Sequence, residues 1–217
     1  MVKGVLIDWG GVLTTGLRDA IAEWVLADAI DGSHYRDLMG ELIRHAYEGE
    51  DGAESPIHGL ERGEIAAAEF EAVLAARLMT LNGVPPVAEG LLGRMFSGFR
   101  PVPEMYDMLR AARAAGVTTC LVSNSWGDHY LRDGWDEYFD QVVISGEVGM
   151  RKPEPRIFHH ALALVGLPAE QCVFVDDIEA NVQAARALGM AGVHHRDAGT
   201  TITELESLLS LPLRPRV

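Results

Sequence analysis

The 217-residue chain has only two cysteines, Cys120 and Cys172. Two cysteines cannot build a disulfide framework or a four-cysteine zinc site, so neither device organises the fold. Both cysteines fall in short apolar runs that read as buried strands. We therefore expect two free, buried thiols and a reducing, cytoplasmic location.

Long apolar runs are missing as well. No segment approaches the roughly 20 apolar residues that a membrane-spanning helix needs. The N-terminal stretch carries one lysine and is interrupted by Asp8 and Gly10, which makes it a poor secretory signal. These absences predict a cytoplasmic protein that has no membrane partner.

Positive charge is scarce, with 18 Lys and Arg residues against 32 Asp and Glu residues and a formal net charge of -14. This balance argues against nucleic acid or an anionic membrane as the main partner, although a local cluster can still bind a small phosphorylated ligand. The chain also contains no G-x-x-x-x-G-K-S/T or G-x-G-x-x-G motif, so it lacks both of these phosphate-cradling loops.

Short apolar runs alternate with helical patterns along most of the chain. The expected strands are residues 2–8, Thr118–Val122, Gln141–Ile144, Cys172–Val175 and Gly192–His194. The expected helices around them are Val102–Ala115, Pro155–Val165, Glu179–Leu188 and Thr200–Leu209. Alternation of this kind predicts an α/β fold in which a parallel sheet carries helices on both faces.

Residues 16–99 break this alternation, because they show helical periodicity and no convincing strand. Helices are expected within 17–29 and 35–43, and at Glu64–Leu78 and Val87–Phe99. We therefore divide the chain into a core, residues 1–15 and 100–217, and an α-helical insert, residues 16–99.

Two finer expectations concern this insert. The apolar face of the helix at Glu64–Leu78 is expected to consist of Phe70, Val73, Leu74 and Leu78. The acidic stretch Glu48–Ser55 is expected to be a solvated loop, as most charge runs are.

Polar side chains follow several of the apolar runs. Because ligands bind at the carboxyl ends of parallel strands, we expect these side chains to lie around one crevice. An insert placed after the first strand would emerge on the same side and lie over the crevice as a lid. The polar residues are Asp8, Ser123, Asn124, Lys152, Asp176 and Asp177.

Each of these residues has an ordinary structural explanation when it is taken alone. An aspartate at a strand end often caps a turn or the next helix, which applies to Asp8 and to Asp176–Asp177. Ser123–Asn124 is a common turn pair, and an isolated lysine such as Lys152 is usually solvated. Their shared order and position favour a common functional site.

The residue types in this crevice point to phosphoryl-transfer chemistry. Three converging carboxylates repel one another and need a cation, and oxygen ligands suit Mg²⁺, which also binds phosphate oxygens. Asp8 would be a nucleophile that forms a covalent aspartyl intermediate. The cation and Lys152 would neutralise charge on the transferred group, while Ser123 would hold one of its oxygens. Trp126 would line one wall of the crevice.

Four segments carry a resemblance to a known family. They are Leu6–Leu13, Leu121–Asn124, Gly149–Pro155 and Phe174–Asp177. Together, these segments resemble the motifs of the haloacid dehalogenase superfamily of aspartyl hydrolases, and the likeness extends from the first strand to the last helix. The resemblance implies a Rossmann-like core, a helical cap and a Mg²⁺ site.

The same resemblance implies roles for individual residues. Asp8 would be the nucleophile and a metal ligand, with Asp177 and the carbonyl of Gly10 as further ligands. Asp176 would support the metal site or Lys152. The expected substrate contacts are Ser123, Asn124, Trp126 and Lys152.

Two branches of the superfamily are similar in detail. Residues 123–126 and 175–181 are similar to the phosphatase domain of soluble epoxide hydrolases. Residues 149–158 and 61–65 are similar to bacterial sugar-phosphate phosphatases. The resemblance thus implies a small phosphorylated metabolite as substrate, with a sugar phosphate as one candidate.

The identity of the substrate would depend on the insert and its border. Four polar residues there are candidates for the crevice, although each is expected to be an ordinary surface residue: His45, Glu61, Arg62 and Arg100.

One position, Gly10, departs from the family pattern, in which a second aspartate serves as general acid and base. Such a group typically contributes about 10²–10⁴-fold to the rate. A good leaving group, a substitute group from the cap or the substrate, or a loss of catalysis would each account for the glycine. Two alternatives to a phosphatase therefore stay open: a carbon–halogen hydrolase and a binding protein without chemistry. The oligomeric state is open too, a homodimer included.

Overall fold

The computed structural model describes residues 1–47, 55–127, 130 and 132–214. Five parallel strands form one sheet in the order β3-β2-β1-β4-β5. The strands are β1 (Gly4–Ile7), β2 (Thr118–Ser123), β3 (Gln141–Ile144), β4 (Cys172–Asp176) and β5 (Ala191–His194). Every residue of β1 and β4 is buried, as expected for central strands that are covered on both faces.

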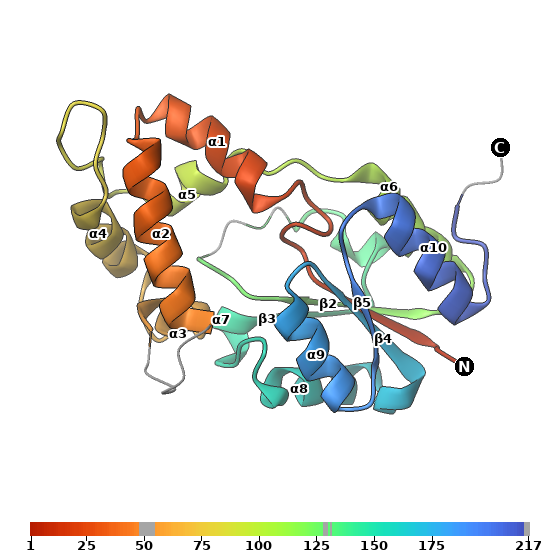
Figure 1. Ribbon diagram of the computed structural model, residues 1–217. Coiled ribbons are helices and arrows are strands. Elements are labelled where there is room, and N and C mark those ends of the chain that lie inside the picture. The colour runs from red at the N-terminus through yellow and green to blue at the C-terminus, as the bar shows by residue number, and fades with distance from the viewer. Residues whose placement is uncertain (48–54, 128–129, 131, 215–217) are drawn as a thin grey trace.

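Helices cover both faces of this sheet (Figure 1). Alternate strand residues point to opposite faces. Val5 and Ile7 pack with α6 (Pro103–Ala114) and α10 (Ala198–Leu209), whereas Leu6 packs with α8 (Pro155–Val165) and α9 (Glu179–Ala187). The predicted α/β class with a Rossmann-like parallel sheet is confirmed.

In the described part of the chain between β1 and α6, five helices form the helical insert. They are α1 (Leu17–Ala27), α2 (Gly32–Tyr47), α3 (Pro56–Glu61), α4 (Ala67–Arg77) and α5 (Leu91–Phe96). The insert has its own hydrophobic cluster, in which Trp24, Phe70 and Leu91 are buried. Figure 1 shows it beside the sheet, at the end away from the N-terminus. None of the helices in the described parts of the chain is long and apolar enough to span a membrane.

The two chain segments that connect the insert to the core run side by side. Thr14 and Pro101 form an isolated antiparallel bridge. The Val102 amide donates to the Leu13 carbonyl at 2.9 Å, and the Thr15 amide donates to the Arg100 carbonyl at 2.8 Å. The two covalent connections between the insert and the core thus lie next to each other.

Two sequence-based expectations about the insert are wrong. Val73 does not face inward, because 52% of its surface is exposed, and Glu71 takes an inward position instead. The buried carboxylate of Glu71 accepts hydrogen bonds from the Gly90 amide at 3.1 Å and the Leu92 amide at 2.9 Å, at the start of α5. The helix expected from Val87 begins only at Leu91, after Gly90 in a left-handed conformation with φ 68°.

Two short helices have no counterpart in the sequence-based expectations. They are α3 and α7 (Ser145–Val148). Residues 48–54 of the acidic stretch expected to be a loop lie outside the described residues, and Ser55 caps α3, where its hydroxyl accepts from the Ile57 amide at 3.3 Å. The two cysteines are free and buried as predicted.

Candidate active site

Asp8 and Asp176 lie at the carboxyl ends of the neighbouring strands β1 and β4. The Asp8 amide donates to the Val175 carbonyl at 2.9 Å, which extends the β1–β4 pairing to the aspartate itself. Lys152, in the loop after α7, places its ammonium 2.7 Å from both Asp8 Oδ1 and Asp176 Oδ2. The Lys152 side chain is only 1% exposed, so this ion cluster lies at the floor of the crevice.

Asp176 is fixed by several donors besides Lys152. Its Oδ1 accepts from the Ile178 amide at 2.8 Å and from Asn181 Nδ2 at 3.0 Å. The same Asn181 amide also approaches Oδ2 at 3.1 Å. Both oxygens of Asp176 are therefore engaged by protein groups, and Asp176 acts as the anchor of Lys152.

Asn124 holds the backbone of Lys152. Its Nδ2 donates to the Lys152 carbonyl at 3.0 Å, and its Oδ1 accepts from the Lys152 amide at 2.8 Å. This pair of bonds spans the gap between the end of β2 and the loop that carries the lysine. The side-chain amide expected to contact substrate is thus engaged with Lys152, and its role toward substrate stays a prediction.

Ser123 ends β2 and is buried beside a residue that the sequence did not single out. Its Oγ lies 2.9 Å from the Tyr130 hydroxyl. Burial raises the pKa of Tyr130 above its usual value, so the phenol stays protonated. Tyr130 comes seven residues after Ser123 and is itself part of no helix or strand, and no periodic signal in the sequence points to it.

Asp177 follows the end of β4 and faces the crevice. Gly11 has a φ of +75°, which favours glycine, and a Cβ there would fall 2.3 Å from Asp177 Oδ2 and displace that carboxylate. Partial burial and the adjacent Asp176 raise the pKa of Asp177 to about 6, while Lys152 opposes the rise. Burial likewise raises the pKa of Asp8 to about 7, against the pull of Lys152.

The residues present fit a divalent cation. One oxygen from each of Asp8, Asp176 and Asp177 can be chosen so that all three lie within 4.8 Å of one another. Burial is the main cause of the raised pKa values of Asp8 and Asp177, and neighbouring carboxylates that a single ammonium cannot neutralise add to the rise. Since the oxygens of Asp176 already accept several hydrogen bonds, Asp8 and Asp177 are the better placed direct ligands for a hard cation.

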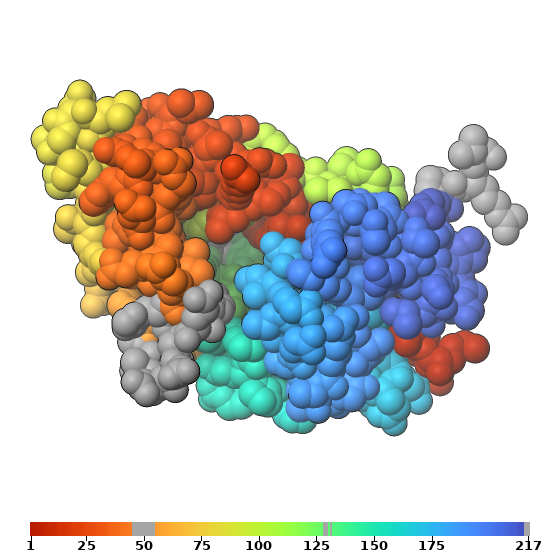
Figure 2. Space-filling view, viewed as in Figure 1, coloured from red at the N-terminus to blue at the C-terminus, as the bar shows by residue number. Residues whose placement is uncertain are grey.

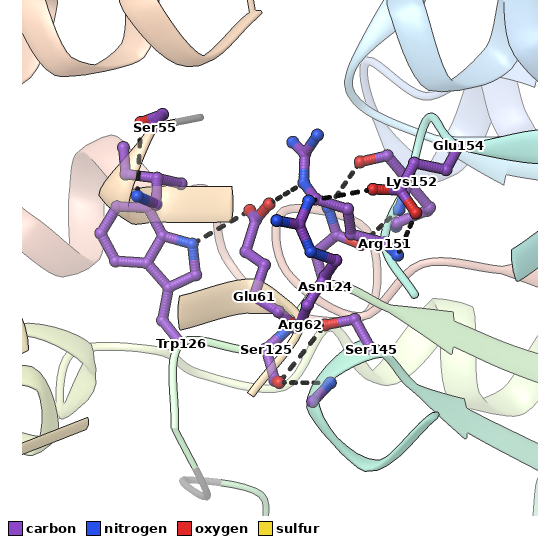
Figure 3. A network of polar contacts seen from close by, with 12 residues as sticks. Ser55, Glu61, Arg62, Asn124, Ser125, Trp126, Ser145, Arg151, Lys152 and Glu154 are labelled. Atoms are coloured by element: carbon purple, nitrogen blue, oxygen red, sulfur yellow. Dashed lines mark hydrogen bonds and ion pairs between the residues drawn. The ribbon is translucent and has the colours of Figure 1, made fainter. Parts of the chain in front are cut away.

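The helical insert contacts the core next to Lys152 through Glu61, the last residue of α3. Glu61 Oε1 accepts from Trp126 Nε1 at 3.2 Å, and Oε2 pairs with the Arg151 guanidinium (Figure 3). The Glu61 carbonyl also accepts a hydrogen bond from the Ser145 hydroxyl. Glu61 is only 1% exposed, so the expectation of an ordinary surface residue is wrong.

Arg62 and Arg100, two further polar candidates, form ion pairs with other residues. Arg62 pairs with Glu64 and, at 3.2 Å, with Glu154. Arg100 is exposed and pairs with Glu23 at 3.0 Å. The side chain of His45 lies outside the described residues.

A cavity of about 550 Å³ opens above the ion cluster, between the insert and the core. Figure 2 shows this hollow between the orange helices of the insert and the blue helices of the core. Asp8, Gly10, Lys152 and Asp177 lie at its base, and Trp126 lines a wall as expected. The structure therefore brings all of the predicted site residues to one crevice except Asp176, which lies directly beneath it.

Residues 2–189 match the family model of haloacid dehalogenase-like hydrolases, and the chain belongs to that family. The expected membership of the haloacid dehalogenase superfamily and the expected class of hydrolase are thus confirmed.

Two relatives illustrate how much of the chain is similar to known proteins. The chain is 33% identical over 155 residues to the sesquiterpene phosphatase astK of Aspergillus oryzae, covering 69% of this chain and 76% of the relative. It is 37% identical over 112 residues to bifunctional epoxide hydrolase 2 of Rattus norvegicus, covering 46% of this chain. The matched region spans only 20% of that larger enzyme.

A solved structure has the same fold. It is a haloacid dehalogenase family enzyme from Bacteroides thetaiotaomicron in complex with magnesium and inorganic phosphate, and it superposes with a TM-score of 0.64 at 23% identity. The likeness covers 90% of this chain and 95% of that one.

The contact between Glu61 and Arg151 yields a testable consequence. Glu61→Gln removes the carboxylate from a buried charged pair, so we expect a loss of about 1–3 kcal/mol in the free energy of unfolding. Glu64→Gln is the matched control, because its carboxylate forms a surface pair with Arg62 that is worth below about 1 kcal/mol. Urea unfolding measures both, and equal losses in the two variants would contradict the importance of the Glu61 contact.

Proposed function

We propose that the chain is a Mg²⁺-dependent phosphatase that hydrolyses a small phosphate monoester through an aspartyl phosphate on Asp8. The observation that carries this proposal is the ammonium of Lys152, held 2.7 Å from both Asp8 and Asp176 at the floor of an open cavity. A relative named as a phosphatase and a structural neighbour that binds magnesium and phosphate support it.

The two oxygens of Asp8 have different surroundings. Oδ1 accepts from the Trp9 amide at 2.7 Å and from Lys152. Oδ2 has no hydrogen-bond partner in the described parts of the chain, which leaves it available to attack phosphorus. The attack forms the Asp8–phosphorus bond and breaks the bond between phosphorus and the alcohol oxygen, which takes a proton from solvent. Water then attacks the same phosphorus, releasing phosphate and the free carboxylate.

Charge stabilisation in this scheme comes from both the protein and the metal. Lys152 lies where it can pair with an oxygen of the transferred group as Asp8 loses its negative charge. Asp8, Asp177 and the carbonyl of Gly10 would hold Mg²⁺, which supplies further positive charge for the phosphoryl oxygens. Ser123 and Trp126 would contact the substrate.

The helical insert, residues 16–99, would serve as the cap, and residues 1–15 and 100–217 would form the catalytic core. The cavity lies between them, so opening the cap would admit substrate and closing it would exclude water. Three carboxylates at this site favour cation chemistry over carbon–halogen hydrolysis. A sugar phosphate as substrate and a homodimer as the assembly stay predictions.

Asp8→Asn tests the proposed nucleophile. The amide cannot form the aspartyl phosphate, so we expect release of phosphate from acetyl phosphate and para-nitrophenyl phosphate to fall at least 10³-fold, to the level of the chelator-treated protein. Thermal unfolding should show that the fold persists. Asp107→Asn, on the exposed side of α6, is the matched control with full activity. Unchanged turnover in Asp8→Asn, or turnover without metal, would contradict the mechanism.

Gly10→Asp tests the missing acid and base. A Cβ at Gly10 would meet no atom within 4 Å, so a side chain can begin there without a clash. We expect turnover of alkyl phosphates to rise by about 10-fold or more, because their leaving oxygen needs a proton. Acetyl phosphate, a good leaving group, should gain little. Gly10→Ala controls for bulk, and an equal effect of both variants on both esters would contradict this interpretation.

A further inference from the structure

The upper part of the cavity is lined by apolar side chains of the insert. We call this set the apolar wall: Leu17, Ile21, Met39, Ile43, Phe96 and Phe99. They come from α1, α2 and the end of the insert, so three separate segments contribute apolar side chains to the same cavity. Trp9, Trp126 and Ile178 of the core face them across the cavity.

The aromatic part of this lining is held in place by ring contacts. The rings of Phe96 and Phe99 stack with centroids 5.5 Å apart, and Trp9 packs edge-on against Phe99 at 5.4 Å. Trp126 packs edge-on against Phe96 at 6.0 Å, and its indole donates to Glu61. The cavity is thus preformed, as ligand sites usually are.

Three aliphatic side chains around the cavity keep much of their surface exposed. Leu17 is 43% exposed, Ile43 39% and Ile178 40%. Other apolar residues of the same helices, Ile21 and Met39, are nearly fully buried. Covering exposed apolar surface lowers the free energy of the complex. These residues therefore favour an apolar ligand group over a hydrated one.

Most polar side chains that line the cavity are already engaged by protein groups. Glu61 binds Trp126 and Arg151, and Asn124 binds the backbone of Lys152. The Asn181 amide nitrogen donates to Asp176, while its Oδ1 has no hydrogen-bond partner among the described residues. Glu179 pairs with Arg186 and His194. A sugar with several hydroxyl groups would find few partners above the ion cluster, and its desolvation would go uncompensated.

Positive charge in the cavity is limited to its base. Among the described residues that line it, Lys152 is the only Lys or Arg. Glu61, Asp177 and Glu179 add negative charge around it. One phosphate beside Asp8 can therefore pair with the Lys152 ammonium, whereas a second phosphate would lie against apolar side chains or carboxylates.

From these features we infer that the substrate is the monophosphate ester of an extended apolar alcohol, with its phosphate at Asp8 and Lys152 and its hydrocarbon against the apolar wall. Sugar phosphates and diphosphates of the same alcohols are disfavoured. This inference rests on the proposed phosphatase function for turnover, but the binding preference that it predicts is independent of the chemistry.

The test compares kcat/KM for butyl, hexyl and octyl monophosphate, farnesyl monophosphate, farnesyl diphosphate and glucose 6-phosphate, all below their micelle concentrations. We expect kcat/KM to rise about two- to fourfold for each added methylene group. Farnesyl monophosphate should exceed both its diphosphate and glucose 6-phosphate at least tenfold. A flat series, or a preference for glucose 6-phosphate, would overturn the inference and leave the phosphatase proposal standing.

Two variants test whether the dependence of kcat/KM on chain length arises in the cavity. Ile43→Glu places a charge in the apolar wall, so the dependence on chain length should flatten. Leu26→Glu alters a residue of α1 that is 82% exposed and does not line the cavity, so its series should match the unmodified protein. If both variants kept the full dependence on length, the apolar wall would not be the binding surface.

Calorimetry on Asp8→Asn separates binding from turnover. Affinity for the alkyl phosphates in the presence of Mg²⁺ should rise along the same series. A rise here with no turnover of any ester in the unmodified protein would support the apolar site and refute the phosphatase. Equal affinity for all chain lengths would refute the apolar site, whatever the turnover.

Discussion

The buried ammonium of Lys152 is the constraint on which the rest of the site depends. Burial lowers the pKa of Lys152, but Asp176 and Asp8 outweigh this effect and raise it above its usual value. A buried charge without partners would cost several kcal/mol, so the lysine requires both carboxylates within hydrogen-bond distance. That requirement places β1 beside β4 and brings the loop after α7 beneath the same edge. Asn124 holds the backbone of Lys152, and Asn181 holds the carboxylate of Asp176.

The apolar cavity would give a physical reason for how the proposed phosphatase works with Gly10. A glycine at position 10 cannot act as an acid or base, so another source of rate acceleration would be needed. Binding energy from parts of the substrate that do not react can be used to orient the reacting atoms. An alcohol that covers Leu17, Ile43 and Ile178 would supply such energy. The Glu61–Arg151 pair would make this coupling direct, because it joins the insert to the residue that precedes Lys152.

The sequence predicted those features of the fold and site that follow from local pattern. Alternating apolar runs and helices gave the parallel sheet, and the rule that ligands bind at strand ends brought Asp8, Lys152 and Asp177 together. Features that depend on contacts between distant segments carried no local signal. Tyr130 is itself part of no helix or strand, and Glu61 ends a six-residue helix whose burial results from the core beneath it. Val73 was wrongly placed inward because Glu71, as a buried cap for α5, displaced it from the inner face.

The central claim is that Asp8 receives the phosphoryl group. Its most direct test is to mix the protein with Mg²⁺ and para-nitrophenyl phosphate, quench with borohydride, and locate the modified residue by peptide mass spectrometry. Borohydride reduces an acyl phosphate to an alcohol, so the account predicts homoserine at position 8, dependent on substrate and metal. Rapid phosphate release with an unmodified Asp8 peptide, or with the modification at another aspartate, would contradict it.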